Sequence, residues 1–349
     1  MTSIIADAGG AVHGGGVLRM QHVASVFFAP VNTTSGAGKI ADGPTPKPAS
    51  MTNSDLVVST ETGGLGNRLK SWISSMRLSI DARVHWPVTK NMPAAFGELF
   101  ANECAVDAVP DGARVYGSWR LAILPEDEAH LPAGFATVGA GAHPIVRGLG
   151  KAWWQLTGRR TDRYRFMVFP KQHSRRSTRA DARQIDLEYE RIPDYFRTLY
   201  GELFGRVVVR PELLAAANDW AAANLDDTVV GVQVRTWRDD ARRHRKYHVP
   251  SVRRLIRLMD SSGGARFLVV SDSDDVAPML AQRYGAQRVI GYPRTTPRAD
   301  SWLEPLGIQE DLIDMLLLAR TQRLLASYLS TFSEVAWWLG GTKARVSVF

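Results

Sequence analysis

The segment "DLIDMLLLARTQRLLASYLSTFSEVAWWLGG", residues 311–341, contains a helix, a strand and a second helix in succession. Acidic and apolar residues mix in its first part, where we predict a long helix over 309–322. The apolar run 323–328 has the length of a buried strand, and two glycines close the helix predicted for 330–341. A buried strand between helices is typical of a parallel sheet with helices on both faces.

The same alternation of strand and helix extends upstream of this segment. Runs rich in β-branched residues predict strands at 228–235, 265–272 and 288–293. Helices are predicted at 193–204, 211–225, 249–263 and 275–285. We therefore predict a doubly wound, Rossmann-like α/β domain over residues 191–349.

A second domain of this kind is predicted before it. "DLVVST" (55–60) predicts a short buried strand, the glycine-rich loop "GGLGN" (63–67) follows, and an amphipathic helix has apolar positions from Leu69 onward. "RVHWPV" (83–88) predicts the next strand. This order opens a doubly wound domain, so we expect residues 53–190 to form an N-terminal Rossmann-like domain. Residues 1–52 are rich in Gly, Ala, Ser, Thr and Pro, and we expect them to be a disordered extension.

Composition limits the class of protein. The chain has 349 residues, 45% of them hydrophobic and 22% charged, as in a folded globular protein with two cores. Its one cysteine, Cys104, excludes an internal disulfide and fits a reducing compartment, so we expect a cytoplasmic location. No apolar run is long enough for a membrane helix, although peripheral contact with a membrane stays open. The histidine spacing predicts no metal site.

The net charge of +8 suits a polyanionic partner, but it is equally common on solvated surfaces. We expect no nucleic acid partner, because no nucleic-acid-binding motif accompanies the charge. Residues 145–185 are dense in Arg and Lys with interleaved Trp and Tyr. This stretch is either a solvated insertion or a surface for an acceptor or a stacked nucleic acid, since aromatics stack on rings and arginines pair with acidic groups.

Polar residues follow three of the predicted strands, and ligands of doubly wound sheets bind beyond the carboxyl ends of strands. Arg235 ends one strand, Asp272 ends the next, and the hydroxyl-rich turn 330–333 begins a helix. Free N–H groups at a helix start favour an anion, and a guanidinium makes two bonds to a phosphate. Together these residues predict a pocket for a nucleoside diphosphate.

Each of these residues also has a structural explanation. Ser330 and Ser333 are typical helix caps, Asp272 and Asp274 could cap the next helix, and Arg235 could pair with a carboxylate. The triplet 272–274 is also the D-x-D of metal-dependent sugar transferases, although short acidic triplets are frequent by chance.

The set "GGLGNRL" (63–69), "GVQVR" (231–235), "FLVVSDSDDV" (267–276) and the segment 311–341 resembles the fucosyltransferase superfamily. That group includes nodulation and core α1,6-, α1,2- and protein O-fucosyltransferases. The resemblance covers roughly residues 55–100 and 225–341 and implies a GT-B architecture, in which two Rossmann-like domains face each other across a cleft. It also implies a GDP-fucose donor and an inverting reaction without metal or other cofactor.

The resemblance also implies roles for single residues. Arg235 matches the arginine that meets the β-phosphate, and Asp272 matches the aspartate that reads the guanine edge. The turn around the pyrophosphate corresponds to Ser330, Thr331, Phe332 and Ser333. The loop that lines the fucose and acceptor side corresponds to Gly63, Gly64, Gly66 and Asn67, and we expect Asn67 and Arg68 to point polar groups into the cleft.

Two positions depart from the family. Gln233 stands where the family often has a histidine that helps to hold the base, and Thr236 stands where many members have a second arginine. A glutamine can still hydrogen-bond a purine edge. These departures leave the nucleotide identity and the subfamily open.

The predicted chemistry is a single in-line displacement by a saccharide hydroxyl. Arg235 and the helix start would stabilise charge on the departing β-phosphate. The candidates for a general base are Asp239, Asp240 and Glu61. Two alternatives remain: a transferase that uses another nucleotide sugar on the same fold, and a non-catalytic basic protein that binds acidic glycan or nucleic acid.

Overall fold

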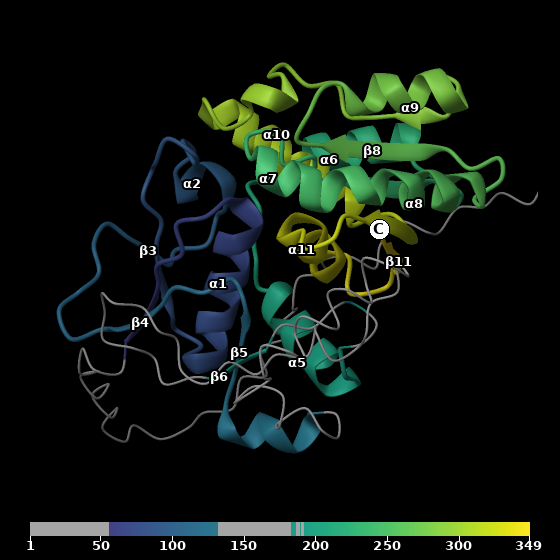
Figure 1. Ribbon diagram of the computed structural model, residues 1–349. Coiled ribbons are helices and arrows are strands. Elements are labelled where there is room, and N and C mark those ends of the chain that lie inside the picture. The colour runs from purple at the N-terminus through teal and green to yellow at the C-terminus, as the bar shows by residue number, and fades with distance from the viewer. Residues whose placement is uncertain (1–55, 132–182, 186–188, 190–191) are drawn as a thin grey trace, which may run out of the picture. The chain divides into compact units, whose positions relative to one another are not determined.

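The computed structural model describes residues 56–131, 183–185, 189 and 192–349, which are coloured in Figure 1. The described residues belong to one compact unit. The predicted disordered extension at 1–52 and, apart from 183–185, the basic insertion at 145–185 lie outside the described residues.

A five-stranded sheet organises the second half of the chain. Its order is β11-β10-β7-β8-β9, and every neighbouring pair is parallel. The strands are β7 (Val230–Val234), β8 (Phe267–Ser271), β9 (Val289–Ile290), β10 (Arg323–Ala326) and β11 (Arg345–Val348). The predicted parallel α/β arrangement is confirmed here, and β11 is an additional edge strand that the sequence analysis did not predict.

Helices cover both faces of this sheet. The helices in this half of the chain are α5 (Asp194–Phe204), α6 (Pro211–Asn224), α7 (Ala241–Arg243), α8 (Val249–Asp260), α9 (Val276–Tyr284), α10 (Pro305–Leu318) and α11 (Thr331–Leu339). One turn of π-helix, η5 (His244–His248), joins α7 to α8, and a short 3-10 turn, η6 (Arg298–Asp300), precedes α10. The helices predicted from the sequence are confirmed to within a few residues, except that α10 begins at Pro305, earlier than predicted.

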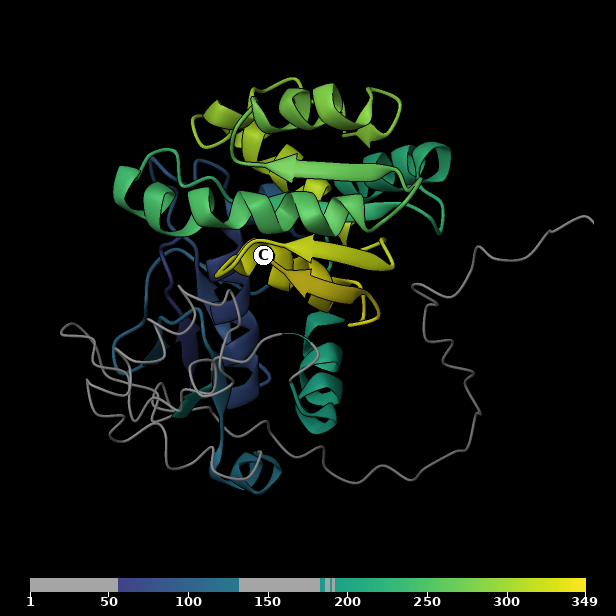
Figure 2. The same cartoon turned by 45° about the vertical axis from the view of Figure 1, so that its right-hand side comes forward.

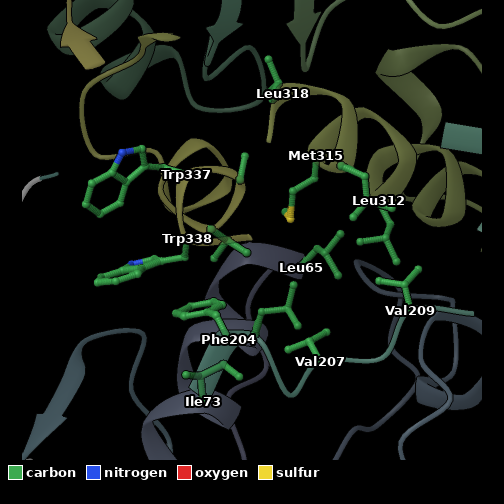
Figure 3. Packing of buried hydrophobic residues seen from close by; sticks show 14 of the residues in the cluster. Leu65, Ile73, Phe204, Val207, Val209, Leu312, Met315, Leu318, Trp337 and Trp338 are labelled. Atoms are coloured by element: carbon green, nitrogen blue, oxygen red, sulfur yellow. The ribbon is translucent and has the colours of Figure 1, made fainter. Parts of the chain in front are cut away.

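The two faces have different partners because side chains alternate along each strand. On one face, Val232 and Val269 pack with Leu255 of α8 and Leu280 of α9. On the other face, Leu268 belongs to a larger core with α10 and α11. Figure 3 shows this core, in which the α10 and α11 side chains reach residues of α1 and α5.

The first half of the chain contains a smaller parallel sheet of order β3-β2-β1-β4. Its strands are β1 (Val57–Ser59), β2 (Arg83–His85), β3 (Ala105–Val106) and β4 (Arg114–Tyr116). An antiparallel pair, β5 (Leu121–Ile123) and β6 (Arg183–Ile185), follows. The remaining elements are α1 (Leu65–Leu78), α2 (Phe96–Leu99) and the 3-10 helix η2 (Pro125–His130).

Helix α1 corrects one expectation. It begins at Leu65, so Gly66, Asn67 and Arg68 belong to its first turns and not to a loop. The reason is that α1 packs against α11, and this tertiary contact keeps a glycine in a helical conformation that its intrinsic propensity disfavours.

The structure is thus mixed α/β with two parallel sheets, as predicted. The division into domains at residue 190/191 stays a prediction. Among the described helices, none combines the length and the apolar character required to cross a membrane.

Candidate functional site

The site lies at the carboxyl edge of the larger sheet. Strands β10, β7 and β8 are neighbours and parallel, so the loops that follow them emerge at the same edge. These loops carry Ser327, Arg235 and Asp272 respectively. The backbone N–H of Arg235 donates to Ser327 Oγ at 2.8 Å, which ties the first two loops together.

Asp272 ties the third loop to the second. Its Oδ1 accepts from the N–H of Thr236 at 2.7 Å, and its Oδ2 accepts from the N–H of Trp237 at 3.3 Å. The Nε of Arg235 lies 3.3 Å from the same Oδ2. The predicted structural pairing of Arg235 with a carboxylate is therefore present. Asp272 holds the loop after β7 rather than capping α9, which has no side-chain cap.

Arg235 is nevertheless available to a ligand. Its side chain is 46% exposed, although Asp272 fixes one edge of the guanidinium. The guanidinium lies 5.0 Å from the ring centroid of Trp237, and Arg243 lies 5.0 Å from the same centroid. Trp237 has a φ of +57°, which is rare for an aromatic residue and is held here by the Asp272 hydrogen bonds. The result is an exposed cation in a rigid loop.

Buried polar atoms without partners lie beside this loop. The structure gives no hydrogen bond to Gln233 Oε1 or to Thr236 Oγ1, although the two residues are only 4% and 5% exposed. Strand alternation directs Gln233 to the sheet face that α10 and α11 cover. Such atoms cost free energy unless water or a ligand satisfies them, so they mark this edge as a binding position.

His248 is a third such residue, and the sequence analysis missed it. Its Nδ1 is buried without a partner, and its ring lies 4.9 Å from that of His244. Burial lowers the pKa of His248, the neighbouring His244 lowers it further, and the charge of Asp272 opposes them. His248 is therefore a neutral imidazole near Asp272 at neutral pH.

The hydroxyl turn at the start of α11 is partly structural. Ser330 Oγ accepts from the N–H of Ser333 at 3.3 Å, so Ser330 caps the helix. Ser333 is fully buried, and its Oγ donates to the Ser330 carbonyl and lies 3.0 Å from the hydroxyl of Tyr189. Phe332 packs against the core. The alternative interpretation as a helix cap is thus correct for Ser330, whereas the Ser333 hydroxyl is buried and does not cap the helix. An anion could still bind to the free backbone N–H groups of the first turn of α11.

The start of α1 lies directly against the start of α11. A Cβ on Gly66 would come within 2.8 Å of the carbonyl carbon and oxygen of Thr331 and 2.9 Å of the Phe332 nitrogen. Thr331 Oγ1 donates to Asn67 Oδ1 at 2.7 Å. The glycine at 66 is therefore required by the packing of two helix starts, and Asn67 joins them.

Two cations of α1 are buried, and one of them joins α1 to α11. Lys70 Nζ lies 2.6 Å and 2.7 Å from the two carboxylate oxygens of Glu334, which links the two helices. Arg68 is only 1% exposed, and it donates to the carbonyls of Gly63 and Pro87. Burial lowers its pKa to about 10, and the charge of Glu61 opposes this. The expectation that Arg68 points into an open crevice is wrong, because its guanidinium satisfies buried backbone carbonyls.

The loop before α1 has a defined conformation. Glu61 Oε1 accepts from the N–H of Gly63 at 2.8 Å. Gly64 is the residue before α1, and a Cβ there would meet nothing within 4 Å. Glu61 therefore lies within the turn that leads to Asn67.

The other predicted acids have structural partners. Asp240 caps α7 through the N–H of Arg243 at 3.0 Å, and Asp239 is exposed 3.4 Å from Arg238. Asp274 accepts from the N–H groups of Arg298 and Ala299, so it caps η6. Asp272 and Asp274 thus hold different loops, and no cluster of three or more potential metal-ligating side chains occurs in the described residues.

Comparison with known proteins gave matches only among solved structures. No family model matches the chain, and no curated protein matches its sequence. NodZ α1,6-fucosyltransferase co-crystallised with GDP is 16% identical over 80% of this chain and 91% of that one, with a TM-score of 0.44. Fucosyltransferase NodZ from Bradyrhizobium is 15% identical over 80% and 92%, with a TM-score of 0.42.

The apo form of POFUT1 is 13% identical over 86% of this chain and 99% of that one, with a TM-score of 0.41. Fucosyltransferases are thus among the solved structures to which the chain is similar, as the motifs led us to expect.

Proposed function

We propose that this protein is an inverting glycosyltransferase that transfers fucose from GDP-fucose to a saccharide hydroxyl. The observation that carries the proposal is Arg235. Asp272 fixes its exposed guanidinium, and its backbone N–H bonds to Ser327 in the loop that leads into α11. A fixed cation next to a helix start suits the pyrophosphate of a nucleotide sugar. We also propose that the two parallel sheets belong to two Rossmann-like domains of a GT-B architecture, with the boundary at residue 190/191.

Recognition of the base is assigned to the unpartnered polar atoms at the same edge. Gln233 Oε1 can only accept a hydrogen bond, whereas Thr236 Oγ1 can donate or accept one. A guanine edge offers both donors and an acceptor. Binding of guanine would give these two buried atoms hydrogen-bond partners and remove the free-energy cost of leaving them without any. The site would therefore select a base with the same donors and acceptor as guanine.

The reaction is an in-line displacement without cofactor or metal. The acceptor oxygen forms a bond to the anomeric carbon of fucose as the bond from that carbon to the β-phosphate oxygen breaks, and GDP leaves. Arg235 and the first N–H groups of α11 stabilise the charge that develops on the β-phosphate. Loss of one comparable donor costs about 100- to 1000-fold in rate.

The proton of the acceptor hydroxyl goes to a general base, for which Glu61 is the first choice. One Glu61 oxygen accepts from the N–H of Gly63. The other forms no hydrogen bond or ion pair with a described residue, so it can accept a proton at the turn that leads to Asn67. Asp240 and Asp239 are weaker choices, because the first caps α7 and the second lies outward beside Arg238. Glu61→Gln should lower kcat and leave GDP affinity unchanged.

Thermal unfolding with a panel of nucleotides tests the donor. We expect GDP to stabilise the protein, by about 2.7 kcal/mol at 100 times its dissociation constant. UDP and ADP should stabilise it less, and EDTA should have no effect. Selectivity for UDP would indicate another nucleotide sugar, and the absence of stabilisation by any nucleotide would contradict the proposal.

A further inference from the structure

Residues 241–260 form one continuous helical segment, α7, η5 and α8, which we call the basic helix. Figure 2 shows it as the long green helix that runs in the foreground alongside the strands. It carries six arginines and one lysine: Arg242, Arg243, Arg245, Lys246, Arg253, Arg254 and Arg257. Its only acidic residue is Asp260, at the end.

Described carboxylates lie near the two ends of the basic helix, but not near Arg253 and Arg257. Asp260 is held by Arg283 at 3.1 Å and by the hydroxyl of Tyr284 at 2.8 Å, both on α9. Asp240, just before the helix, pairs with Arg243 at 3.2 Å. Across the described part of the chain, no carboxylate lies within ion-pair distance of Arg253 or Arg257, which are both exposed.

The arginines of α8 also repel one another. Arg253 and Arg257 are four residues apart and share one side of the helix, where like charges are destabilising. Arg254 is three residues from Arg257, and its pKa is lowered by burial and further by the charge of Arg257. An anion bound along this side would remove the repulsion, so the helix has the electrostatics of a binding surface.

The basic helix begins at the candidate site. The guanidinium groups of Arg243 and Arg235 each lie 5.0 Å from the ring centroid of Trp237, and His244 Nδ1 lies 2.7 Å from the carbonyl oxygen of Thr236. From Arg242 to Arg257 the helix extends roughly 22 Å at 1.5 Å per residue. A ligand that contacts both ends must therefore be an extended chain, and one end of it would lie at the site.

We propose that the basic helix binds an acidic saccharide chain that carries carboxylates or sulfates, and that such a chain is the acceptor of the transfer reaction. The second statement rests on the proposed function. Six of the seven cations are arginines, whose planar guanidinium pairs with discrete oxyanions through two hydrogen bonds. The arginines of the helix thus form a row of groups that can bind oxyanions, and this row leads to Arg235.

Two other polyanions fit the helix less well. An anionic membrane surface is usually contacted with apolar or aromatic anchors, but Val249 is the one large hydrophobic residue of this helix that is markedly exposed. A single-stranded nucleic acid needs free aromatic faces for stacking. Here Trp237 is covered by two arginines, and Lys246 lies 4.6 Å from the ring of Tyr247.

The test compares R253E/R257E with a matched double variant, R83E/R206E, that makes the same change in net charge on β2 and after α5. The probes are a heparin-derived octasaccharide, oligogalacturonate, a neutral chito-oligosaccharide, phosphatidylserine vesicles and a single-stranded oligonucleotide. Wild type and the R83E/R206E control should bind the two acidic saccharides, and R253E/R257E should bind them at least about tenfold more weakly. R253K/R257K keeps the charge but loses the two-bond geometry, so it should retain only part of the binding. An unchanged urea unfolding midpoint of R253E/R257E shows that its loss of binding does not come from misfolding.

GDP stabilisation, measured on the same proteins, separates this proposal from the proposed function. It should be equal in wild type and R253E/R257E, since neither arginine contacts the site. Equal loss of saccharide binding in both Glu variants would overturn the proposal, as would tighter binding of vesicles or oligonucleotide than of either acidic saccharide. Failure of GDP to stabilise the wild type would instead overturn the proposed function.

Discussion

Substitution of Gly66 by alanine tests the contact between the two helix starts that form one side of the site. The added methyl group would lie 2.8 Å from the carbonyl carbon and oxygen of Thr331 and 2.9 Å from the nitrogen of Phe332. These are backbone atoms of α11, which cannot turn away as a side chain can. Overpacking of this kind costs about 1–3 kcal/mol, and alanine recovers up to about 1 kcal/mol of helix propensity. We expect a net loss of stability of up to about 2 kcal/mol.

The matched control is Gly201→Ala in α5. Gly201 is also inside a helix, but a Cβ there would meet nothing within 4 Å. This variant should be more stable than wild type by about 0.5–1 kcal/mol. The same chemical change should therefore differ between the two positions by about 1–3 kcal/mol, which is the cost of the overpacking alone.

Urea unfolding measures this difference as a change in midpoint at constant m-value. A second readout is stabilisation by GDP, which Gly201→Ala should keep and Gly66→Ala should weaken, since the clash displaces the first turn of α11. The reasoning is refuted if Gly66→Ala is as stable as Gly201→Ala and binds GDP as wild type does.

Three further predictions concern single side chains. Lys70→Met leaves Glu334 buried without its cation, which should cost about 3–5 kcal/mol in urea unfolding, whereas Lys70→Met with Glu334→Leu should recover much of it. The pKa of His248 is lowered in the folded state, so protonation of His248 opposes folding. The free energy of unfolding should therefore fall as the pH drops below the unfolded pKa of about 6.5. His248→Gln should reduce the slope of the unfolding free energy against pH in this range. Asp272→Asn keeps one hydrogen bond to the loop but loses the charge beside Arg235; GDP binding by calorimetry should weaken about tenfold, and unchanged binding would contradict the positioning role.

The sequence predicted the elements whose signals are local. The strands β7, β8 and β10 lie in mainly apolar runs, and Pro211 and Gly285 mark the start of α6 and the end of α9. By contrast, β11 is only four residues long and includes an arginine and a serine, so it was missed.

The first turn of α1 and its partners depend on tertiary contacts and could not be predicted. Gly66 and Thr331, like Lys70 and Glu334, are more than 260 residues apart, and no local pattern links them. Arg68 appeared to be a ligand-binding residue because it follows a glycine-rich turn, but only the fold shows that Pro87 and Gly63 occupy its guanidinium.

In the candidate site, too, some residues could be predicted from local sequence signals and others depend on tertiary contacts. Arg235 and Asp272 were found because strand ends in a parallel sheet meet at one edge, and this rule needs only the strand assignments. The sequence could not show that Asp272 fixes Arg235 or that Gln233 has an oxygen without a hydrogen-bond partner, because both depend on side-chain geometry. His248 was missed because its neutrality arises from burial beside His244.

Calorimetric titration of GDP and of guanosine into wild type and Arg235→Ala tests the central claim, that Arg235 binds the pyrophosphate of a guanine nucleotide sugar. We expect wild type to bind GDP more tightly than guanosine. Arg235→Ala should lose about 1.5–3 kcal/mol of GDP affinity, since the lost hydrogen bonds involve a charged group, and should bind guanosine as wild type does. Equal affinity of wild type and Arg235→Ala for GDP would contradict the claim.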